Sequence, residues 1–192
     1  MASVESALRK AVADLNAIRA RWALIGGLAV SARTIPRFTK DLDFAVAVAD
    51  DAEAEDTVHR LRSYGYHPAE ILEQDYVERL SGVRLVGAGS DVVMDLLFAS
   101  SGIEGEVVAS AEQLEVLPRL TAPVATTAHL IALKVLAGRN QDLTDLSYLI
   151  STASPADLDT ARDAVKLIQA RGFNRQNDIV NDLDQLIRDA GR

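Results

Sequence analysis

The sequence predicts an α+β fold, with a mixed, twisted sheet and flanking helices in residues 1–120 and a helical lobe in residues 121–192. Two observations lead to this prediction. Short apolar runs bounded by glycine or proline are concentrated in the first 120 residues, whereas helical apolar spacing fills the rest, and such segregation is typical of α+β proteins. At 192 residues and 48% hydrophobic content, the chain can also bury a substantial core, in one unit or two small lobes. A soft boundary falls around residues 118–123.

The first elements follow from the spacing of apolar residues. Residues 3–19 carry an apolar side chain every three or four positions, which predicts an amphipathic helix. Residues 22–25 are apolar throughout and predict a short buried strand. The Gly26-Gly27 pair breaks that strand, and a helix over residues 28–33 must end before Pro36, because proline disfavours helical geometry in the residue before it.

The middle of the chain predicts the rest of the sheet. Residues 42–48 alternate between acidic and apolar residues and then become fully apolar, as a buried strand does. Residues 50–64 predict a helix, because their acidic first turn suits the helix dipole and Gly65 ends the run; residues 66–68 then resume extended chain. Three more strand candidates, separated by glycine-containing turns, suggest an antiparallel meander: 76–80, 83–86 and 91–98.

Helices dominate the remainder of the sequence. A short extended piece near residues 114–117 comes first, and the boundary region follows it. Apolar periodicity then predicts four helices, over residues 126–137, 142–150, 155–170 and 175–189.

Composition excludes several kinds of site. The chain has no cysteine and three scattered histidines, so any metal must be held by carboxylates. No apolar run approaches the roughly 18 residues that span a bilayer, and the first residues lack the apolar core of a secretory signal, so we expect a soluble, cytoplasmic protein. The net charge of −8 argues against a surface that binds nucleic acid indiscriminately, although a local basic groove is compatible with it.

Three acidic residues are the candidate metal ligands. Asp41 and Asp43 are separated by one residue on a predicted strand, so both side chains point to the same face. Asp95 lies in a strongly apolar strand candidate, where an unpartnered charge would be costly. Carboxylates held close together repel one another and favour a divalent cation, and Mg²⁺ prefers such oxygen ligands, with Mn²⁺ as an alternative.

A glycine turn and basic residues precede these acids. Gly26 and Gly27 would let a phosphate approach backbone N–H groups at the start of the following helix. Arg33, Arg37 and Thr39 lie between the turn and the acidic strand, so positive charge and a hydroxyl gather where a polyphosphate would be held.

The ordered segments Gly26 to Arg33 and Pro36 to Phe44 resemble the GG, arginine and DLD pattern of DNA-polymerase-β-like nucleotidyltransferases, and the closest match is the AbiEii/AbiGii toxin branch with its MenT-like enzymes. The resemblance covers residues 22 to about 150 and continues with Asp95 and with segments similar to that branch's lysine and DxxD motifs. It implies a minimal nucleotidyltransferase core over residues 1–120. The motif residues in the second half are Lys134, Asp142 and Asp145.

The resemblance also implies roles. Two metal ions would be bridged by Asp41 and Asp43, and Asp95 would bind the ion nearer the acceptor and accept its proton. The nucleoside triphosphate would contact the glycine turn and a group of further residues: Arg33, Arg37, Thr39, Lys134, Asp142 and Asp145. Lys134 lies in an apolar helical run and needs an acidic or phosphate partner, which Asp142 and Asp145 could provide if they do not act on the acceptor; Asp142 also fits an ordinary acidic helix start.

The acceptor has several readings. Resemblance to MenT-like enzymes implies a tRNA 3′ end and a toxin with a cognate antitoxin. A small molecule is an alternative, as in aminoglycoside and lincosamide nucleotidyltransferases, and so is AMP transfer to a protein hydroxyl. A non-catalytic binding module is the remaining reading, and retention of all three acids and Lys134 disfavours it.

Overall fold

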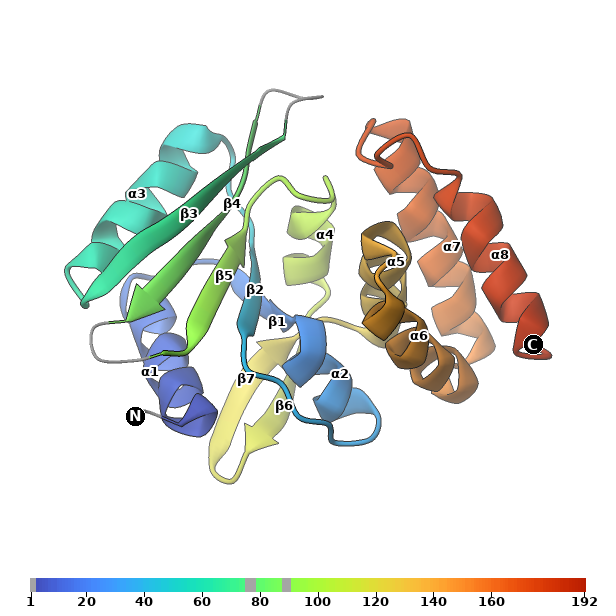
Figure 1. The fold of residues 1–192 in the computed structure, drawn as a ribbon, viewed down its shortest axis with the longest axis horizontal. Helices are drawn as coiled ribbons and strands as arrows, with labels where there is room; N and C mark the ends of the chain where they lie inside the picture. The colour runs from blue at the N-terminus through green and yellow to red at the C-terminus, as the bar shows by residue number, and fades with distance from the viewer. Residues whose placement is uncertain (1–2, 75–78, 88–90) are drawn as a thin grey trace.

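A seven-stranded mixed sheet forms the centre of the protein, in the strand order β3-β4-β5-β2-β1-β7-β6 (Figure 1). The structure is a computed structural model that describes residues 3–74, 79–87 and 91–192. The strands are β1 Trp22–Ile25, β2 Leu42–Val46, β3 Tyr66–Gln74, β4 Arg79–Gly87, β5 Val93–Leu97, β6 Glu112–Leu117 and β7 Leu120–Val124.

Strand pairing explains the mixed character of the sheet. The strands β3, β4 and β5 form an antiparallel meander, and β6 and β7 form an antiparallel hairpin. Two parallel pairings join these parts, β5 to β2 and β1 to β7, while β1 and β2 run antiparallel. Each of the short central strands β1 and β2 therefore has a neighbouring strand on both sides. The residues that follow β1 consequently lie near the middle of the sheet.

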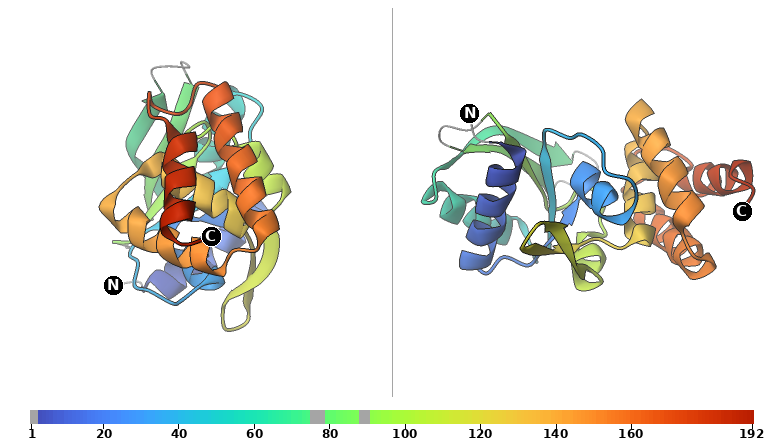
Figure 2. Two further views of the ribbon diagram at one scale, coloured as in Figure 1. Left: turned by 90° about the vertical axis from the view of Figure 1, so that its right-hand side faces the viewer. Right: turned by 90° about the horizontal axis from the view of Figure 1, so that it is seen from below.

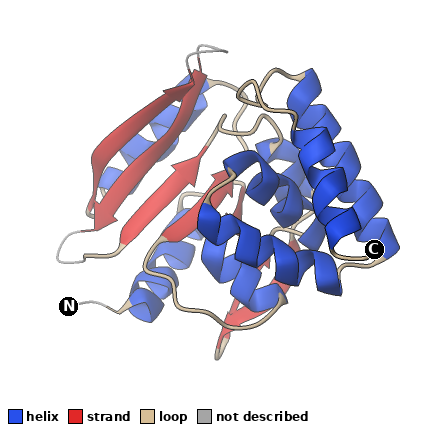
Figure 3. Ribbon diagram, turned by 45° about the vertical axis from the view of Figure 1, so that its right-hand side comes forward, coloured by secondary structure: helices blue, strands red, loops and turns tan. Residues whose placement is uncertain are grey.

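In the part of the chain that the structure describes, eight helices surround the sheet or continue beyond it. Figure 2 shows the last four gathered at one end of the molecule, and Figure 3 shows the strands on one side and these helices on the other. The helices α2 and α4 lie between the sheet and this group, with α2 contacting α5 and α4 contacting β1 and β2. The helices are α1 Val4–Ala17, α2 Gly26–Arg33, α3 Asp51–Arg62, α4 Glu104–Ala109, α5 Thr127–Ala137, α6 Asn140–Thr152, α7 Pro155–Ala170 and α8 Ile179–Asp189.

Local sequence sets the ends of helix α5, which carries Lys134, and the start of helix α7. Helix α5 begins where the Thr126 hydroxyl accepts a hydrogen bond from the backbone N–H of His129, and it ends at Gly138, which adopts the left-handed conformation that glycine tolerates. Helix α7 begins with a capping box between Ser154 and Asp157, with Pro155 in the first turn. Both starts satisfy backbone groups that the helix itself leaves unpaired.

The core lies against both faces of the central strands. Trp22 and Phe44 are buried and pack edge to face, with ring centroids 5.3 Å apart. Their side chains belong to β1 and β2, so this contact fixes the two strands next to the candidate acids. Among the helices of the described residues, none has the length and apolar character that crossing a bilayer requires.

The predicted α+β fold is confirmed. An antiparallel meander is present, but its strands are β3, β4 and β5 and not the three predicted candidates, because the extended chain predicted at residues 66–68 is the start of a full strand. The prediction of a turn at Gly82 was wrong: Gly82 lies inside β4, opposite Leu72 and Leu97, and one continuous strand replaces the candidates 76–80 and 83–86. Residues 76–78 lie outside the described residues. Glycine is required at position 82, because a Cβ on that residue would stand 2.7 Å from the carbonyl oxygen of Leu96.

Other elements were missed or displaced. Strand β7 was not predicted, and residues 118–123 lie in the hairpin that β7 forms with β6, with Pro123 inside β7. Helix α4 was also missed, because six residues show too little periodicity. The pair Gly26-Gly27 begins α2 instead of preceding it, and α8 begins at Ile179, four residues later than predicted.

Candidate active site

Asp43 and Asp95 lie side by side on parallel strands. They are direct partners in the register of β2 and β5, and the residues that flank Asp43 in the chain, Leu42 and Phe44, are buried in the core. Since side chains alternate between the two faces of a strand, both carboxylates project from the same face of the sheet. Asp41 directly precedes the first residue of β2 and is exposed.

Asp43 is a buried acid whose surroundings disfavour its charged form. Burial, followed by the negative charges of Asp95 and Asp41, raises the pKa of Asp43 to about 6, and the positive charges of Lys134 and Arg139 partly oppose the rise. Across the described residues, the structure gives the Asp43 carboxylate no hydrogen bond or ion pair. A carboxylate in this setting is suited to a cation.

Asp95 has a partner that the sequence did not suggest. Arg84, directly opposite on β4, donates from Nε to Oδ1 and from Nη2 to Oδ2, both at 2.9 Å. This fork geometry is the strong form of an arginine–carboxylate pair. The ion pair and hydrogen bonds raise the pKa of Arg84, so the guanidinium stays charged.

The glycine bend lies against the acids. Gly26 has a φ of +63°, and a Cβ there would stand 1.9 Å from Oδ2 of Asp43. A Cβ on Gly27 would stand 2.8 Å from Nη2 of Arg37 and 3.1 Å from Oγ1 of Thr39. The two glycines therefore allow Asp43 on one side and Arg37 with Thr39 on the other to approach the start of α2. The first N–H groups of a helix have no partner within the helix, so such a start is suited to an anion.

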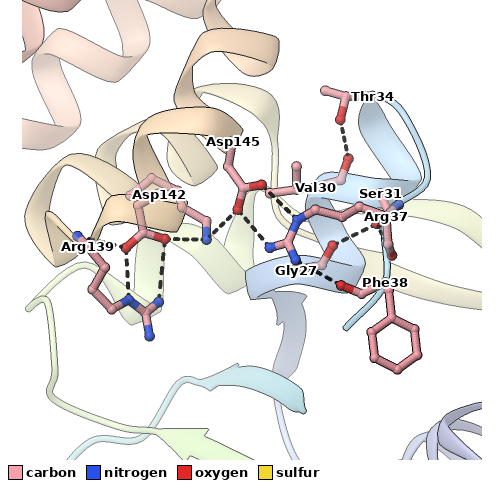
Figure 4. A network of polar contacts seen from close by, with 10 residues as sticks. Gly27, Val30, Ser31, Thr34, Arg37, Phe38, Arg139, Asp142 and Asp145 are labelled. Carbon is pink, nitrogen blue, oxygen red and sulfur yellow. Dashed lines mark hydrogen bonds and ion pairs between the residues drawn. The ribbon is translucent and has the colours of Figure 1, made fainter. Parts of the chain in front are cut away.

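A buried network joins the helices to the glycine bend. The Lys134 ammonium lies 2.6 Å from Oδ1 of Asp142 and 2.8 Å from Oδ2 of Asp145, and all three residues are buried. Figure 4 shows that this network of ion pairs extends to Arg139 at one end and to Arg37 at the other. Arg139 donates from Nε to Oδ2 of Asp142 at 2.9 Å. The three cations of the network therefore alternate with its two carboxylates, and the network as a whole has one positive charge more than negative charges.

Arg37 reaches this network from the loop before β2. Its Nη2 donates to Oδ2 of Asp145 at 2.8 Å, while its Nε lies 2.7 Å from Oδ1 without the geometry of a hydrogen bond. Asp145 therefore holds both Arg37 and Lys134 next to the glycine bend. Asp142 and Asp145 point at cations of the protein, in the orienting position that the sequence allowed for them.

Arg33 lies elsewhere. Its guanidinium donates to the backbone carbonyls of Ala125 and Val124 and pairs with Glu112 at 2.8 Å, so it braces the end of β7. The structure does not bring Arg33 together with the other predicted site residues. Its position in the chain, seven residues after Gly26, made it a candidate, but it points away from the acids.

A cleft of about 270 Å³ brings these groups together. One side is apolar, with Leu130, Leu133 and Leu136 of α5 among its residues. Ser100 and Ser101 also line it. The ionic and glycine residues of its wall are Gly26, Asp43, Arg84, Asp95, Lys134, Arg139 and Arg175.

A family comparison agrees with this arrangement. The family described as "Nucleotidyl transferase AbiEii toxin, Type IV TA system" matches residues 10–191, which include every element of the cleft. The chain belongs to this AbiEii family. A comparison with curated proteins found no match.

Solved structures share the fold of this AbiEii protein. A nucleotidyltransferase-like antigen from Paracoccidioides brasiliensis is 16% identical with a TM-score of 0.52, over 97% of this chain and 92% of that one. MenT4, a nucleotidyltransferase toxin from Mycobacterium tuberculosis, is 20% identical with a TM-score of 0.52, over 83% and 61%. ANT(2'')-Ia bound to adenylyl-2''-tobramycin is 16% identical with a TM-score of 0.50, over 97% and 98%. The AbiEii protein is a nucleotidyltransferase.

The donor set of the AbiEii protein fits a divalent cation at one place. Asp43 has a carboxylate without a protein partner, and Asp41 adds a second, exposed carboxylate two residues away. Over the part of the chain that the structure describes, however, no three carboxylates or histidines come close enough to hold one ion together. Asp95 is engaged by Arg84 instead.

Two cleft residues of the AbiEii protein were missed at the level of sequence. Arg84 sits between buried Val83 and Leu85, and this alternation places it on the face of the acids once the register of β4 and β5 is known. Arg175 enters the cleft from the segment between α7 and α8, about 80 residues further along the chain than Asp95, and no local pattern marks it.

Proposed function

We propose that the protein transfers a nucleoside monophosphate from a nucleoside triphosphate to the 3′ hydroxyl of tRNA, as the toxin of a toxin–antitoxin pair. In this reaction the hydroxyl oxygen bonds to the α-phosphorus, the bond from that phosphorus to the α,β-bridging oxygen breaks, and pyrophosphate leaves. A carboxylate of the Asp43–Asp95 pair accepts the hydroxyl proton.

One observation carries the proposal most strongly. The adjacent carboxylates of Asp43 and Asp95 face the same cleft as the Gly26 bend and the Lys134 ammonium. Negative groups that attract a metal ion therefore lie within reach of backbone N–H groups and cations that attract phosphates, which is what nucleotidyl transfer requires.

Each group has a definite task in the proposed reaction. Asp41 and Asp43 hold Mg²⁺, which supplies charge neutralisation at the triphosphate when it is bound. Gly26 and Gly27 offer the start of α2 to the β- and γ-phosphates, with Arg37 and Thr39 beside them. Arg33 is no longer part of this proposal, because its guanidinium is committed to Glu112 and the end of β7.

Lys134 is the fixed positive charge of the site. The ammonium is buried and held by Asp142 and Asp145, so its position is set before the nucleotide arrives. We propose that these two aspartates act by orienting Lys134, Arg37 and Arg139 and do not contact the nucleotide themselves.

The acceptor and the partner rest on the family. Membership of a type IV toxin family favours a cognate antitoxin as partner and a macromolecular acceptor, and the likeness in fold to MenT4 is compatible with it. A small-molecule acceptor is the second candidate, favoured by the net charge of −8, since acidic proteins gain little from the phosphates of RNA.

A labelling experiment separates the acceptors. The purified protein is incubated with Mg²⁺ and each α-labelled triphosphate in turn, together with total tRNA, an aminoglycoside and lincosamide panel, or a cell extract depleted of RNA. We expect label on tRNA, and none on tRNA whose terminal diol has been oxidised. EDTA and Asp43→Asn should abolish it.

Other outcomes overturn parts of the proposal. Label on an antibiotic supports the small-molecule alternative, and label on protein supports AMP transfer to a protein hydroxyl. If no triphosphate labels any acceptor while the protein remains folded, the catalytic proposal fails and the binding-module reading gains.

A further inference from the structure

We propose that Arg84 takes the place of a second metal ion at Asp95, so that the reaction uses one divalent ion, held by Asp41 and Asp43. This inference rests on the proposed nucleotidyl transfer and refines its chemistry. Arg84 thereby becomes a positioning residue for Asp95, with a role that the two-ion arrangement would assign to a metal.

The argument begins with a row of charged residues across four neighbouring strands. Glu70 on β3 is opposite Arg84 on β4, Arg84 is opposite Asp95 on β5, and Asp95 is opposite Asp43 on β2. Direct partners in a sheet share a face and lie about 5 Å apart. The row ends at Ile25 on β1, the residue before Gly26. Arg84 is thus aligned with the reacting centre by the backbone of the sheet.

The Arg84 side chain also contacts the side chains of both residues that the register places opposite it. Both oxygens of Asp95 accept a hydrogen bond from Arg84 at 2.9 Å, and Nη1 of Arg84 lies 3.5 Å from Oε2 of Glu70. Asp95 is only 16% exposed, against 41% for Arg84, so the guanidinium closes the more buried carboxylate from the solvent side. A planar guanidinium held at two points is a directional cation, unlike a lysine ammonium.

Arg84 offsets the charge of one of the three candidate ligands. Its guanidinium is paired with the carboxylate of Asp95, and Glu70, the remaining acid of the row, is exposed on the far side of Arg84, so the carboxylates of Asp41 and Asp43 remain to hold a divalent cation. Asp95 shares its oxygens with Arg84, whereas Asp43 has no protein partner in the described chain. The ion should therefore prefer the Asp41 and Asp43 side.

Manganese binding tests the inference without relying on turnover. The full chain is mixed with Mn²⁺ and an unreactive triphosphate that has a methylene group between the α- and β-phosphorus atoms. Electron paramagnetic resonance then distinguishes a single ion from a pair, because two ions about 3.5 to 4 Å apart couple magnetically. We expect an uncoupled signal of one bound ion for the wild type and a coupled pair for Arg84→Gln.

Calorimetry on the nucleotide-free protein gives a second, independent reading. Arg84→Gln should bind Mn²⁺ about tenfold more tightly than the wild type, because Asp95 gains free oxygens. Asp95→Asn should change the affinity by less than about threefold, whereas Asp43→Asn should weaken it by roughly 30-fold or more, as expected for loss of a direct ligand.

Two variants control for folding and for charge. Arg79→Gln removes an arginine from the same strand whose partner, Asp51 at 2.6 Å, lies outside the cleft, and it should leave both readings unchanged. Arg84→Lys keeps the charge and loses the fork, and it should still exclude the second ion. Thermal melts confirm that each variant is folded before it is titrated.

Some results would overturn the inference. A coupled manganese pair in the wild type, or an Arg84→Gln variant that matches the wild type in both ion number and affinity, would show that Arg84 does not replace an ion. Failure of the wild type to bind any Mn²⁺ with the triphosphate would count against the proposed function itself, and so the two failures are distinguishable.

Discussion

Asp43, the proposed cation ligand, carries a buried charge that is costly to the fold. Burial and two neighbouring carboxylates raise its pKa to about 6, so the folded protein binds a proton at this position more tightly than the unfolded chain, whose pKa is 3.8. Stability from this group is therefore fully present below pH 3.8 and is lost as the pH rises through 6. The loss is at most roughly 3 kcal/mol, since one pKa unit corresponds to about 1.4 kcal/mol.

The first prediction follows from this loss of stability when Asp43 ionises. In metal-free buffer at pH 7.5, Asp43→Asn should melt about 3 to 6 °C above the wild type, because it removes a buried charge without a partner. At pH 4 the difference should shrink. Added Mg²⁺ should stabilise the wild type and leave Asp43→Asn unchanged.

The control for this measurement is Asp41→Asn, which removes an exposed carboxylate from the same cluster and should change the melting temperature in EDTA very little. An Asp43→Asn variant that melts at or below the wild type at pH 7.5 without metal would contradict the assignment of Asp43 as an unpaired, stressed carboxylate.

At the scale of elements, two helices and one loop meet through Asp145. This buried carboxylate pairs with Lys134 of α5 at 2.8 Å and with Arg37 of the loop before β2 at 2.7 Å. Removing one partner from a buried ion network leaves the remaining charges uncompensated, which costs about 3 to 5 kcal/mol. The same carboxylate holds Lys134 and Arg37, two cations of the proposed nucleotide site, so we expect both stability and nucleotide binding to depend on Asp145.

The second prediction concerns that contact. Asp145→Asn should lower the free energy of unfolding by about 3 kcal/mol and raise the KM for the triphosphate, because Arg37 loses its anchor. Denaturant unfolding and initial rates measure the two effects.

Asp159→Asn is the matched control. Asp159 pairs with Arg162 at 2.9 Å but is 75% exposed, so its loss should cost less than about 0.5 kcal/mol and leave KM unchanged. Equal effects of the two substitutions would mean that burial of the Asp145 network contributes nothing.

The elements also show which features a sequence can reveal. The alternation around Asp43 and the apolar run around Asp95 place both residues on strands, and the parallel pairing of β2 and β5 then makes them neighbours. The pair between Arg84 and Asp95 depends on the register of β4 against β5, and a slip of one residue would turn Arg84 to the other face. Register is a property of two segments together, so composition and periodicity of either one cannot supply it.

The positions of Arg33 and β7 also depend on contacts between distant segments, which the sequence alone does not reveal. Arg33 lies between the glycine bend and Asp41 in the chain, but α2 turns its side chain toward Glu112, and only the packed helix decides this direction. Strand β7 contains Pro123, which weakens a local strand pattern, and its place beside β1 comes from a parallel contact about 100 residues away in the chain.

At the scale of the whole molecule, the cleft lies between the sheet and the carboxyl-terminal helices. Asp43 and Asp95 come from strands, while Lys134 and Arg139 come from α5 and the residues after it. We propose that the chain divides into a nucleotidyltransferase core and a helical lobe, as the sequence suggested, with the division after β7 because that strand, which extends to Val124, pairs with β1.

Arg175 is the farthest contribution of the lobe to the cleft. It lies between α7 and α8, it lines the same cleft as Asp95, and its Nη2 reaches Oγ of Ser100 at 3.5 Å. Arg175 and Gln176 have φ values of 53° and 62°, and consecutive left-handed residues other than glycine are costly, at about 1 to 3 kcal/mol each. Such strain is retained where the position of a side chain matters, and here it directs a cation toward the cleft.

The third prediction is that Arg175, which lines the same cleft as Gly26, binds the triphosphate. Arg175→Ala should raise the KM for the triphosphate about tenfold, equivalent to about 1.4 kcal/mol, with a smaller change in kcat, because an interaction present equally in the ground and transition states affects binding alone. Arg188→Ala removes an exposed arginine of the same lobe that hydrogen-bonds Gln185 and should leave both constants unchanged. If Arg175→Ala left KM at the wild-type value, the lobe would act on the cleft through α5 alone and the strained segment would need another explanation.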